Sequence, residues 1–169
     1  TWPLAGRAEE MSVIRAALSA PEVSGILLCG AAGVGKSRIA RQALATAETH
    51  GHESRWVVGT SAAQTIPLGA FTAWATPGVT DTIQLVRGVI DALTTSSARP
   101  VLLGVDDVQL LDELSIFVVH QVVQRGAAKV LLTVRDEPSS AALQEMLKAG
   151  QFARLDIQPL TLDKTTALL

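Results

Sequence analysis

Apolar residues along the chain alternate between two patterns. Short, solid apolar runs predict buried strands, and longer stretches with apolar residues three or four positions apart predict helices. The expected strands are Ile26–Cys29, Arg55–Thr60, Val101–Val105, Lys129–Val134 and Ala153–Ile157. The expected helices are Glu9–Ala20, Lys36–Thr49, Asp81–Thr95, Asp112–Gln124 and Ser139–Lys148, with a helical turn at Phe71–Trp74. This order predicts an α/β fold of three layers, in which helices cover both faces of a five-stranded parallel sheet.

The sequence predicts both the start and the buried face of the helix at Asp81–Thr95. Asp81 is a suitable N-cap, because its carboxylate accepts hydrogen bonds from the free N–H groups of the first turn. Ile83, Val86, Ile90 and Leu93 recur at helical spacing, so we expect all four to face the core.

Composition limits what such a domain does. The chain has 169 residues, enough for one α/β domain, and 48% of them are hydrophobic, which excludes wholesale disorder. We expect residues 1–160 to form this domain and residues 161–169 to begin a truncated helical lid. Fourteen basic against sixteen acidic residues give a net charge of −2, and aromatic residues are 4% of the chain. Both values disfavour direct binding of nucleic acid by this fragment.

The single cysteine and the short apolar runs indicate the cellular compartment in which the protein is expected. Cys29 has no partner for an internal disulfide, which favours a reducing compartment. No apolar run approaches the roughly 20 residues that a membrane-spanning helix needs. We therefore expect a cytoplasmic domain without membrane contact, in which Cys29 is a core residue.

The segment after the first predicted strand fits the phosphate-loop pattern Gly-x-x-x-x-Gly-Lys-Ser. It reads Gly30, Ala31, Ala32, Gly33, Val34, Gly35, Lys36 and Ser37, and a helix follows it, which is the context that this motif requires. Glycines at 30, 33 and 35 are expected to adopt positive φ, so that backbone N–H groups form a concave nest for phosphate oxygens. The fold class expected is therefore that of the P-loop NTPases.

The last two residues of the motif are assigned separate roles. Lys36 is expected to reach the β- and γ-phosphates of ATP, and the Ser37 hydroxyl to take one position on Mg²⁺. A glycine-rich turn that contains Lys-Ser by chance is the competing reading, and the strand and helix around it make that reading the weaker one.

Two carboxylates follow the strand predicted at Val101–Val105. Asp106 is expected to bind Mg²⁺, and Asp107 to orient or deprotonate an attacking water. Adjacent residues of a strand point to opposite sides, which favours separate roles for the two acids. Gly104 is unfavourable inside a strand, so it suggests that another group approaches the backbone closely.

The next predicted strand brings Thr133 and Arg135 to the same edge of the sheet. Arg135 could report the presence of the γ-phosphate. It could equally be a surface arginine paired with Asp136 or Glu137, and the residues alone leave both readings open.

Taken together, these residues resemble the STAND class of P-loop ATPases. More narrowly, the chain is similar to the nucleotide-binding domain of large LuxR-family (MalT-like) bacterial transcriptional regulators. The segments that carry this resemblance span almost the whole chain: Leu4–Met11, Gly30–Ser37, Ile66–Phe71, Val105–Asp112, Leu131–Arg135 and Leu155–Leu160.

The resemblance implies further roles. Arg135 becomes a γ-phosphate sensor, and Gly6 and Arg7 border the adenine or ribose. With the phosphate loop and Arg38 these residues form the expected nucleotide-binding set, although Arg38 and Arg41 also fit a solvated helix face. In the family, ADP holds a closed state and exchange for ATP permits self-association. The lid, sensor and DNA-binding domains of such regulators would lie outside these 169 residues.

Three other functions stay open from the residues alone. A small P-loop kinase would need an arginine-rich lid, which the sequence does not clearly show. A module that binds nucleotide without useful hydrolysis is not excluded by the sequence, because no arginine finger is evident in the chain. An AAA-type ATPase of DNA replication would bind DNA through basic residues, which the net charge of −2 disfavours. A GTPase is disfavoured because an Asn-Lys-x-Asp guanine motif is absent.

Overall fold

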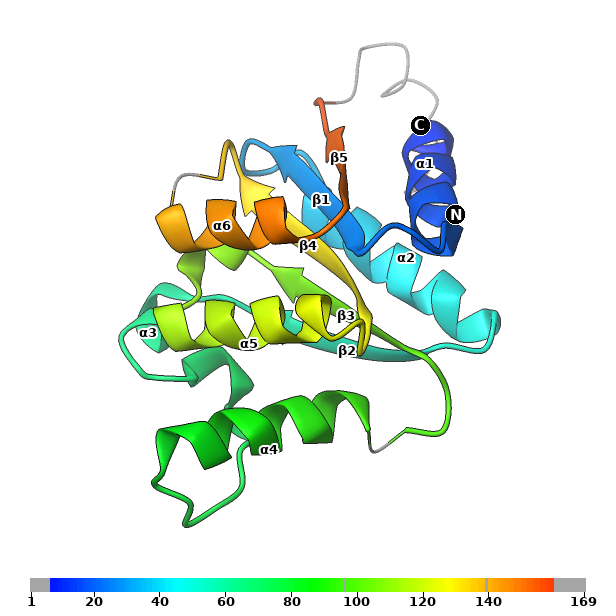
Figure 1. Cartoon of the computed structure of the whole chain (residues 1–169). Coiled ribbons are helices and arrows are strands. Elements are labelled where there is room, and N and C mark those ends of the chain that lie inside the picture. The colour runs from blue at the N-terminus through cyan, green and yellow to red at the C-terminus, as the bar shows by residue number, and fades with distance from the viewer. Residues whose placement is uncertain (1–6, 96, 139, 160–169) are drawn as a thin grey trace.

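The computed structural model describes residues 7–95, 97–138 and 140–159, and its helices and strands alternate along the chain (Figure 1). The strands are β1 (Gly25–Gly30), β2 (Glu53–Val58), β3 (Val101–Asp106), β4 (Lys129–Arg135) and β5 (Phe152–Asp156). The helices are α1 (Ala8–Ser19), α2 (Lys36–Thr49), α3 (Ser61–Gln64), α4 (Thr82–Thr94), α5 (Glu113–Gln124) and α6 (Ala141–Ala149). Two 3₁₀ turns, η2 (Gly69–Trp74) and η3 (Val108–Leu110), complete the described elements.

The five strands form one sheet in the order β2-β3-β4-β1-β5, and every neighbouring pair is parallel. This confirms the predicted fold class. The order places β4 between β1, which precedes the phosphate loop, and β3, which ends in an aspartate. The carboxyl ends of these three strands therefore meet at one edge of the sheet.

Helices cover both faces of the sheet. One apolar cluster lies under α4, α5 and α6, and the other lies under α1 and α2 (Figure 1). Successive residues of β1 divide between the clusters: Leu27 and Cys29 belong to the first, and Ile26 and Leu28 to the second. All four are nearly inaccessible to solvent. This alternation explains why the strands read as solid apolar runs, because both faces of a covered parallel sheet are buried.

The ends of α4 and α5 agree with the sequence predictions. The Asp81 carboxylate accepts a hydrogen bond from the N–H of Gln84 at 2.9 Å, and Asp112 caps α5 in the same way through Ser115. The prediction that Ile83 faces the core is wrong, because 67% of its surface is exposed. It lies in the first turn of α4, and burial along this helix begins only at Val86.

Gly104 of β3 is closely approached by side chains of β2 and α2, as we expected for a glycine inside a strand. A Cβ at this position would lie 2.9 Å from Cε3 of Trp56 and 3.0 Å from Cδ1 of Leu44. The Trp56 ring packs against the cluster under α1 and α2. The guanidinium of Arg41 lies 5.1 Å from the centre of that ring, so this part of α2 is more than a solvated face.

Element boundaries differ from the predictions by one or two residues. β2 begins two residues earlier than predicted and ends at Val58, where Gly59 packs against the backbone of Asp107 too closely for a side chain. The predicted lid helix at residues 161–169 lies outside the described residues. None of the described helices is long and apolar enough to cross a membrane.

Candidate phosphate-binding site

The phosphate loop forms a tight turn between β1 and α2. Gly33 and Gly35 have φ values of +83° and +95°, which favour glycine, and Gly35 is the N-cap residue of α2. The prediction of positive φ at Gly30 is wrong. Gly30 is required for a different reason, because a Cβ there would lie 2.8 Å from the carbonyl oxygen of Ile157 and 3.0 Å from Cγ2 of Val34.

Lys36 is the first residue of α2 and lies beneath the loop. Only 7% of its surface is exposed, and its Nζ donates a hydrogen bond to the carbonyl oxygen of Ala31 at 2.8 Å. Ala31, Ala32 and Gly33 are themselves exposed. A ligand can therefore approach the loop from solvent and meet an ammonium group already placed inside the turn.

Ser37, Asp106 and Thr133 form the most tightly connected polar cluster at this edge. The Ser37 hydroxyl donates to both carboxylate oxygens of Asp106 at 2.8 Å. The buried Thr133 hydroxyl donates to Oδ1 of the same carboxylate at 2.6 Å. The two predicted magnesium ligands are thus in contact, and Thr133 orients the second of them.

These contacts match the needs of Mg²⁺. This ion is usually held by one or two carboxylates, water and substrate phosphates, without a complete protein cage. Among the described residues, no group of three His, Cys, Asp or Glu side chains could hold a metal. Ser37 and Asp106 therefore fit a magnesium ion that is bound together with a nucleotide.

Asp107 leaves the strand instead of continuing it. Its φ and ψ of 52° and 56° are left-handed, so the strand rule that adjacent side chains point to opposite sides does not apply to this pair. Its N–H donates to Oγ1 of Thr133 at 2.8 Å. Its carboxylate accepts a 3.3 Å hydrogen bond from Gln109. Asp107 therefore lies at the edge of the site, in contact with Thr133 and Gln109.

Arg135 ends β4 directly beside the phosphate loop. In the sheet register its Cα is the partner of Gly30, and its N–H donates to Oε1 of Gln109 at 3.2 Å. Its side chain is exposed. The alternative pairing with Asp136 or Glu137 is not formed within 4.0 Å, and Glu137 instead binds Arg154 at 2.6 Å.

Arg7 contacts the phosphate loop from the start of α1. It is 5% exposed, and its guanidinium donates to the carbonyl oxygens of Val34, at 2.6 Å, and Gln158, at 2.9 Å. It also lies 3.6 Å from the carboxylate of Glu10. Arg7 thus joins the loop to the chain after β5, a structural contact that the sequence did not predict.

Two further residues of the predicted nucleotide-binding set are Arg38 and Gly6. Arg38 is exposed on α2, one residue beyond Ser37. Gly6 lies outside the described residues. Neither position therefore tests its predicted role.

A hollow of about 450 Å³ lies beside the loop, at the ends of β4 and β5. Its lining includes two apolar residues, Val34 of the loop and Ile157 directly after β5. It also includes the charged residues Asp136, Glu137, Arg154 and Asp156. Arg154 holds the pKa of the Glu137 carboxyl below its usual value through a hydrogen bond. The excess of carboxylates makes this hollow unsuitable for phosphate groups, but ribose hydroxyls can donate hydrogen bonds to carboxylates.

Cys29 also lines the hollow, yet it is not placed to act as a nucleophile. Its side chain is 2% exposed, and burial raises the pKa of the thiol to about 11. The thiol therefore stays protonated near neutral pH, and only a thiolate is a strong nucleophile. This agrees with the prediction that Cys29 is a core residue.

The comparisons with known proteins show the fold. No protein-family model and no curated protein matches the chain. Among solved structures, Hsp104 with ATPγS and FITC casein has a TM-score of 0.66 at 18% identity, over 99% of this chain and 29% of that chain. AMPPCP-bound DnaA from Aquifex aeolicus has a TM-score of 0.61 at 17% identity, over 95% and 50%. The RuvB branch migration motor of Thermotoga maritima has a TM-score of 0.54 at 17% identity, over 95% and 47%.

These identities are too low to carry an activity or a substrate to this chain. The chain spans about half the length of the DnaA and RuvB chains and less of Hsp104. The strand order, the loop after β1 and these likenesses agree on the architecture: the chain has the α/β fold of the P-loop NTPases.

Proposed function

We propose that the chain binds ATP with Mg²⁺, hydrolyses it slowly and acts as a switch. The observation that carries this proposal is the contact between Ser37 of the phosphate loop and Asp106 at the end of β3. A glycine-rich turn without function would not need a strand-end carboxylate at its serine. A phosphate loop needs both groups at one point, where they can share a metal ion.

The positions of the side chains support the following roles. The loop backbone and Lys36 would hold the phosphates, and Ser37 and Asp106 would hold Mg²⁺, which supplies positive charge against the phosphate oxygens. Thr133 fixes the Asp106 carboxylate through its 2.6 Å hydrogen bond. The acidic hollow beside Val34 is the candidate place for the adenosine, with either ADP or ATP as the ligand.

Hydrolysis is assigned to the residues at the loop edge. Asp107 would orient the attacking water, and Arg135 would contact the γ-phosphate from the end of β4. Support comes from the strand register, in which Arg135 lies opposite Gly30. Because the Arg135 side chain is exposed and therefore adjustable, it is suited to detect whether the γ-phosphate is present.

The finer part of the proposal places this switch in a longer signal-responsive transcriptional regulator in the cytoplasm. It rests on the sequence resemblance to STAND-class, LuxR-family regulators. Its partners would be other domains of the same longer chain and, in the ATP state, a second copy. The fragment itself would bind neither nucleic acid nor membrane. DnaA and RuvB have the same fold, so DNA-dependent stimulation of hydrolysis would favour a DNA-processing ATPase instead.

Nucleotide binding is tested by thermal unfolding with ADP, ATP and GTP, each with and without Mg²⁺. Ligand at about one hundred times its Kd adds about 2.7 kcal/mol of stability, which raises the Tm by about 5–10 °C. We expect this shift with adenine nucleotides in the natural chain and its loss in Lys36→Ala. An equal shift in Lys36→Ala would contradict the assignment of the phosphate loop, and equal shifts with GTP would contradict adenine selectivity.

Hydrolysis is tested separately by phosphate release from the variant Asp107→Asn. We expect unchanged ATP affinity and a turnover reduced by about tenfold or more, because a neutral amide cannot accept a proton from water. Asp91→Asn, an exposed aspartate on α4, is the control and should leave turnover unchanged. Equal turnover in Asp107→Asn and the natural chain would remove its catalytic role, and transfer of phosphate to a small molecule would favour a kinase.

A further inference from the structure

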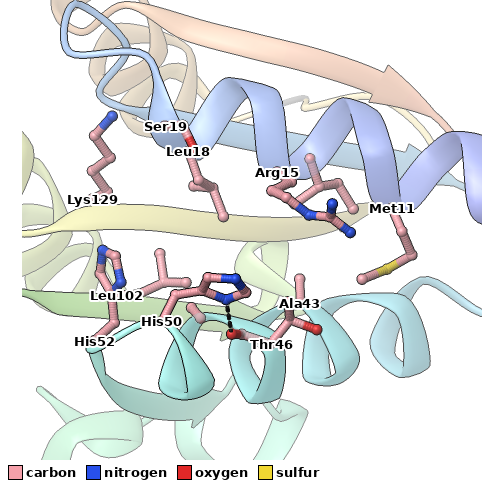
Figure 2. Close-up of a pocket in the computed structure, with 12 residues that line it drawn as sticks. Met11, Arg15, Leu18, Ser19, Ala43, Thr46, His50, His52, Leu102 and Lys129 are labelled. Carbon is pink, nitrogen blue, oxygen red and sulfur yellow. Dashed lines mark hydrogen bonds between the residues drawn. The ribbon is translucent and has the colours of Figure 1, made fainter.

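A second cavity lies between α1 and α2, above the face of the sheet that these helices cover (Figure 2). Its volume is about 160 Å³. Its apolar walls come from both helices and from β3: Met11, Ile14, Leu18, Ala43, Ala47 and Leu102. It shares no lining residue with the phosphate loop or with the hollow beside it.

The ionisable side chains that line this cavity are all basic. Arg15, His50, His52 and Lys129 line it, together with the hydroxyls of Ser19 and Thr46, and its lining contains no carboxylate. Figure 2 shows His52 and Lys129 at one end of the cavity and Met11 at the other. The end near His52 and Lys129 is thus rich in hydrogen-bond donors, whereas the exposed Arg15 lies toward the Met11 end.

Several of these donors have capacity left for a ligand. Nδ1 of His52 is buried and has no hydrogen-bond partner among the described residues. A buried polar atom without a partner is unfavourable, and a ligand acceptor would remove that penalty. Nζ of Lys129 donates one hydrogen bond, to the carbonyl oxygen of Ala20, and an ammonium group has three protons. Arg15 forms no ion pair within 4.0 Å with another described residue.

The volume limits the size of the ligand. An engineered cavity of about 150 Å³ lined by Leu, Ile and Phe binds benzene, so this cavity accepts about six carbon atoms. The donors of Lys129 and His52 at one end match a carboxylate, whose charge strengthens hydrogen bonds from lysine and imidazole N–H groups. We propose that this cavity binds a small free monocarboxylate with an apolar tail of about five or six carbons. This site is distinct from the nucleotide site and does not depend on the function proposed for it.

The test uses hexanoate as the probe and the 169-residue chain as it stands. Isothermal titration calorimetry is run with hexanoate, hexan-1-ol and hexylamine, which share the tail and differ in the head group. We expect saturable binding of hexanoate, at least about tenfold weaker binding of the alcohol, and no binding of the amine. Equal binding of all three probes, or no saturation by hexanoate, would overturn the proposal.

Two variants and a matched control locate the ligand. Ala47→Leu places three more carbons in the cavity and should weaken hexanoate binding by about tenfold or more. Ala45→Leu adds the same side chain at an exposed position of α2 that does not line the cavity, and should bind like the natural chain. Lys129→Gln, which removes the positive charge beside His52, should weaken hexanoate binding more than hexan-1-ol binding. Equal affinities in Ala47→Leu and Ala45→Leu would contradict the location.

A third variant separates this site from the phosphate loop, which also binds anions. Lys36→Ala should retain full hexanoate affinity, because Lys36 lines neither the cavity nor its charged end. Loss of hexanoate binding in Lys36→Ala would place the carboxylate in the phosphate loop and overturn the proposal. The result is informative even if the chain binds no nucleotide, since hexanoate binding is measured without one.

Discussion

Three residues on three neighbouring elements set the chemistry of the candidate site. Asp106 ends β3, Thr133 lies on β4, and Ser37 lies in the first turn of α2. The Asp106 carboxylate is 8% exposed and accepts hydrogen bonds from both hydroxyls. A buried carboxylate needs such donors, because they replace the hydrogen bonds that water would otherwise provide. The same donors hold the carboxylate in one orientation, which a metal ligand requires.

The role of Thr133 can be tested by Thr133→Val, which keeps the shape and removes the hydroxyl. Asp106 loses a donor and the N–H of Asp107 loses its acceptor, so we expect a loss of about 1–3 kcal/mol in unfolding free energy. Magnesium-dependent ATP affinity should fall as well, measured by titration with and without Mg²⁺. Thr94→Val is the matched control, since this buried threonine hydrogen-bonds only within α4. Equal ATP affinity in both variants would mean that Thr133 does not orient the metal ligand.

At the scale of elements, the insertion of β4 between β1 and β3 assembles the site. The register pairs Val105 of β3 with Leu132 of β4, so the next residues along each strand, Asp106 and Thr133, become neighbours. β1 lies on the other side of β4 and brings the phosphate loop to the same edge. The site therefore depends on how closely these strands and the helices above them pack.

The packing of β3 under α2 can be tested by Gly104→Ala. The added Cβ would crowd Trp56 and Leu44, and such overpacking of a core costs about 1–3 kcal/mol. Chemical denaturation measures this loss. The double variant with Leu44→Ala should be more stable than the sum of the two single losses predicts, because the second change removes the two Leu44 methyl groups that crowd the added Cβ. Strict additivity would show that crowding against Leu44 is not the cause of the loss.

At the scale of the whole molecule, the burial of Cys29 within the covered sheet predicts how the free energy of unfolding depends on pH. Burial raises the pKa of the Cys29 thiol from 9.0 to about 11. Between these values the unfolded chain releases this proton and the folded chain retains it. Stability is therefore complete below pH 9 and declines as the pH rises toward 11, by about 2–3 kcal/mol.

Denaturation at several values between pH 8 and pH 11 measures this decline, and Cys29→Ala is the control. The variant lacks the thiol, so its stability should fall less steeply over the same range. The chain contains no tyrosine, which would otherwise titrate in this range. Equal slopes in the two proteins would show that the folded state does not protect the thiol.

Local signals along the chain determined much of this picture. The phosphate loop, the two aspartates at the end of β3 and the arginine at the end of β4 are all visible in sequence, because each follows a short apolar run that is typical of a buried strand. The N-caps at Asp81 and Asp112 are equally local. Boundaries were less certain, as the exposed Ile83 shows, because the end of a helix face depends on where the core stops.

Only the tertiary structure decided which residues meet. The sheet order places Thr133 against Asp106, although 27 positions separate them. Arg7 reaches Val34 and Gln158 because the start of α1 packs beside the loop. The cavity between α1 and α2 likewise exists only through the packing of two helices. Sequence periodicity predicts which face of an element is buried, but it does not predict which other element covers that face. Contacts between distant residues arise from the geometry of the whole fold.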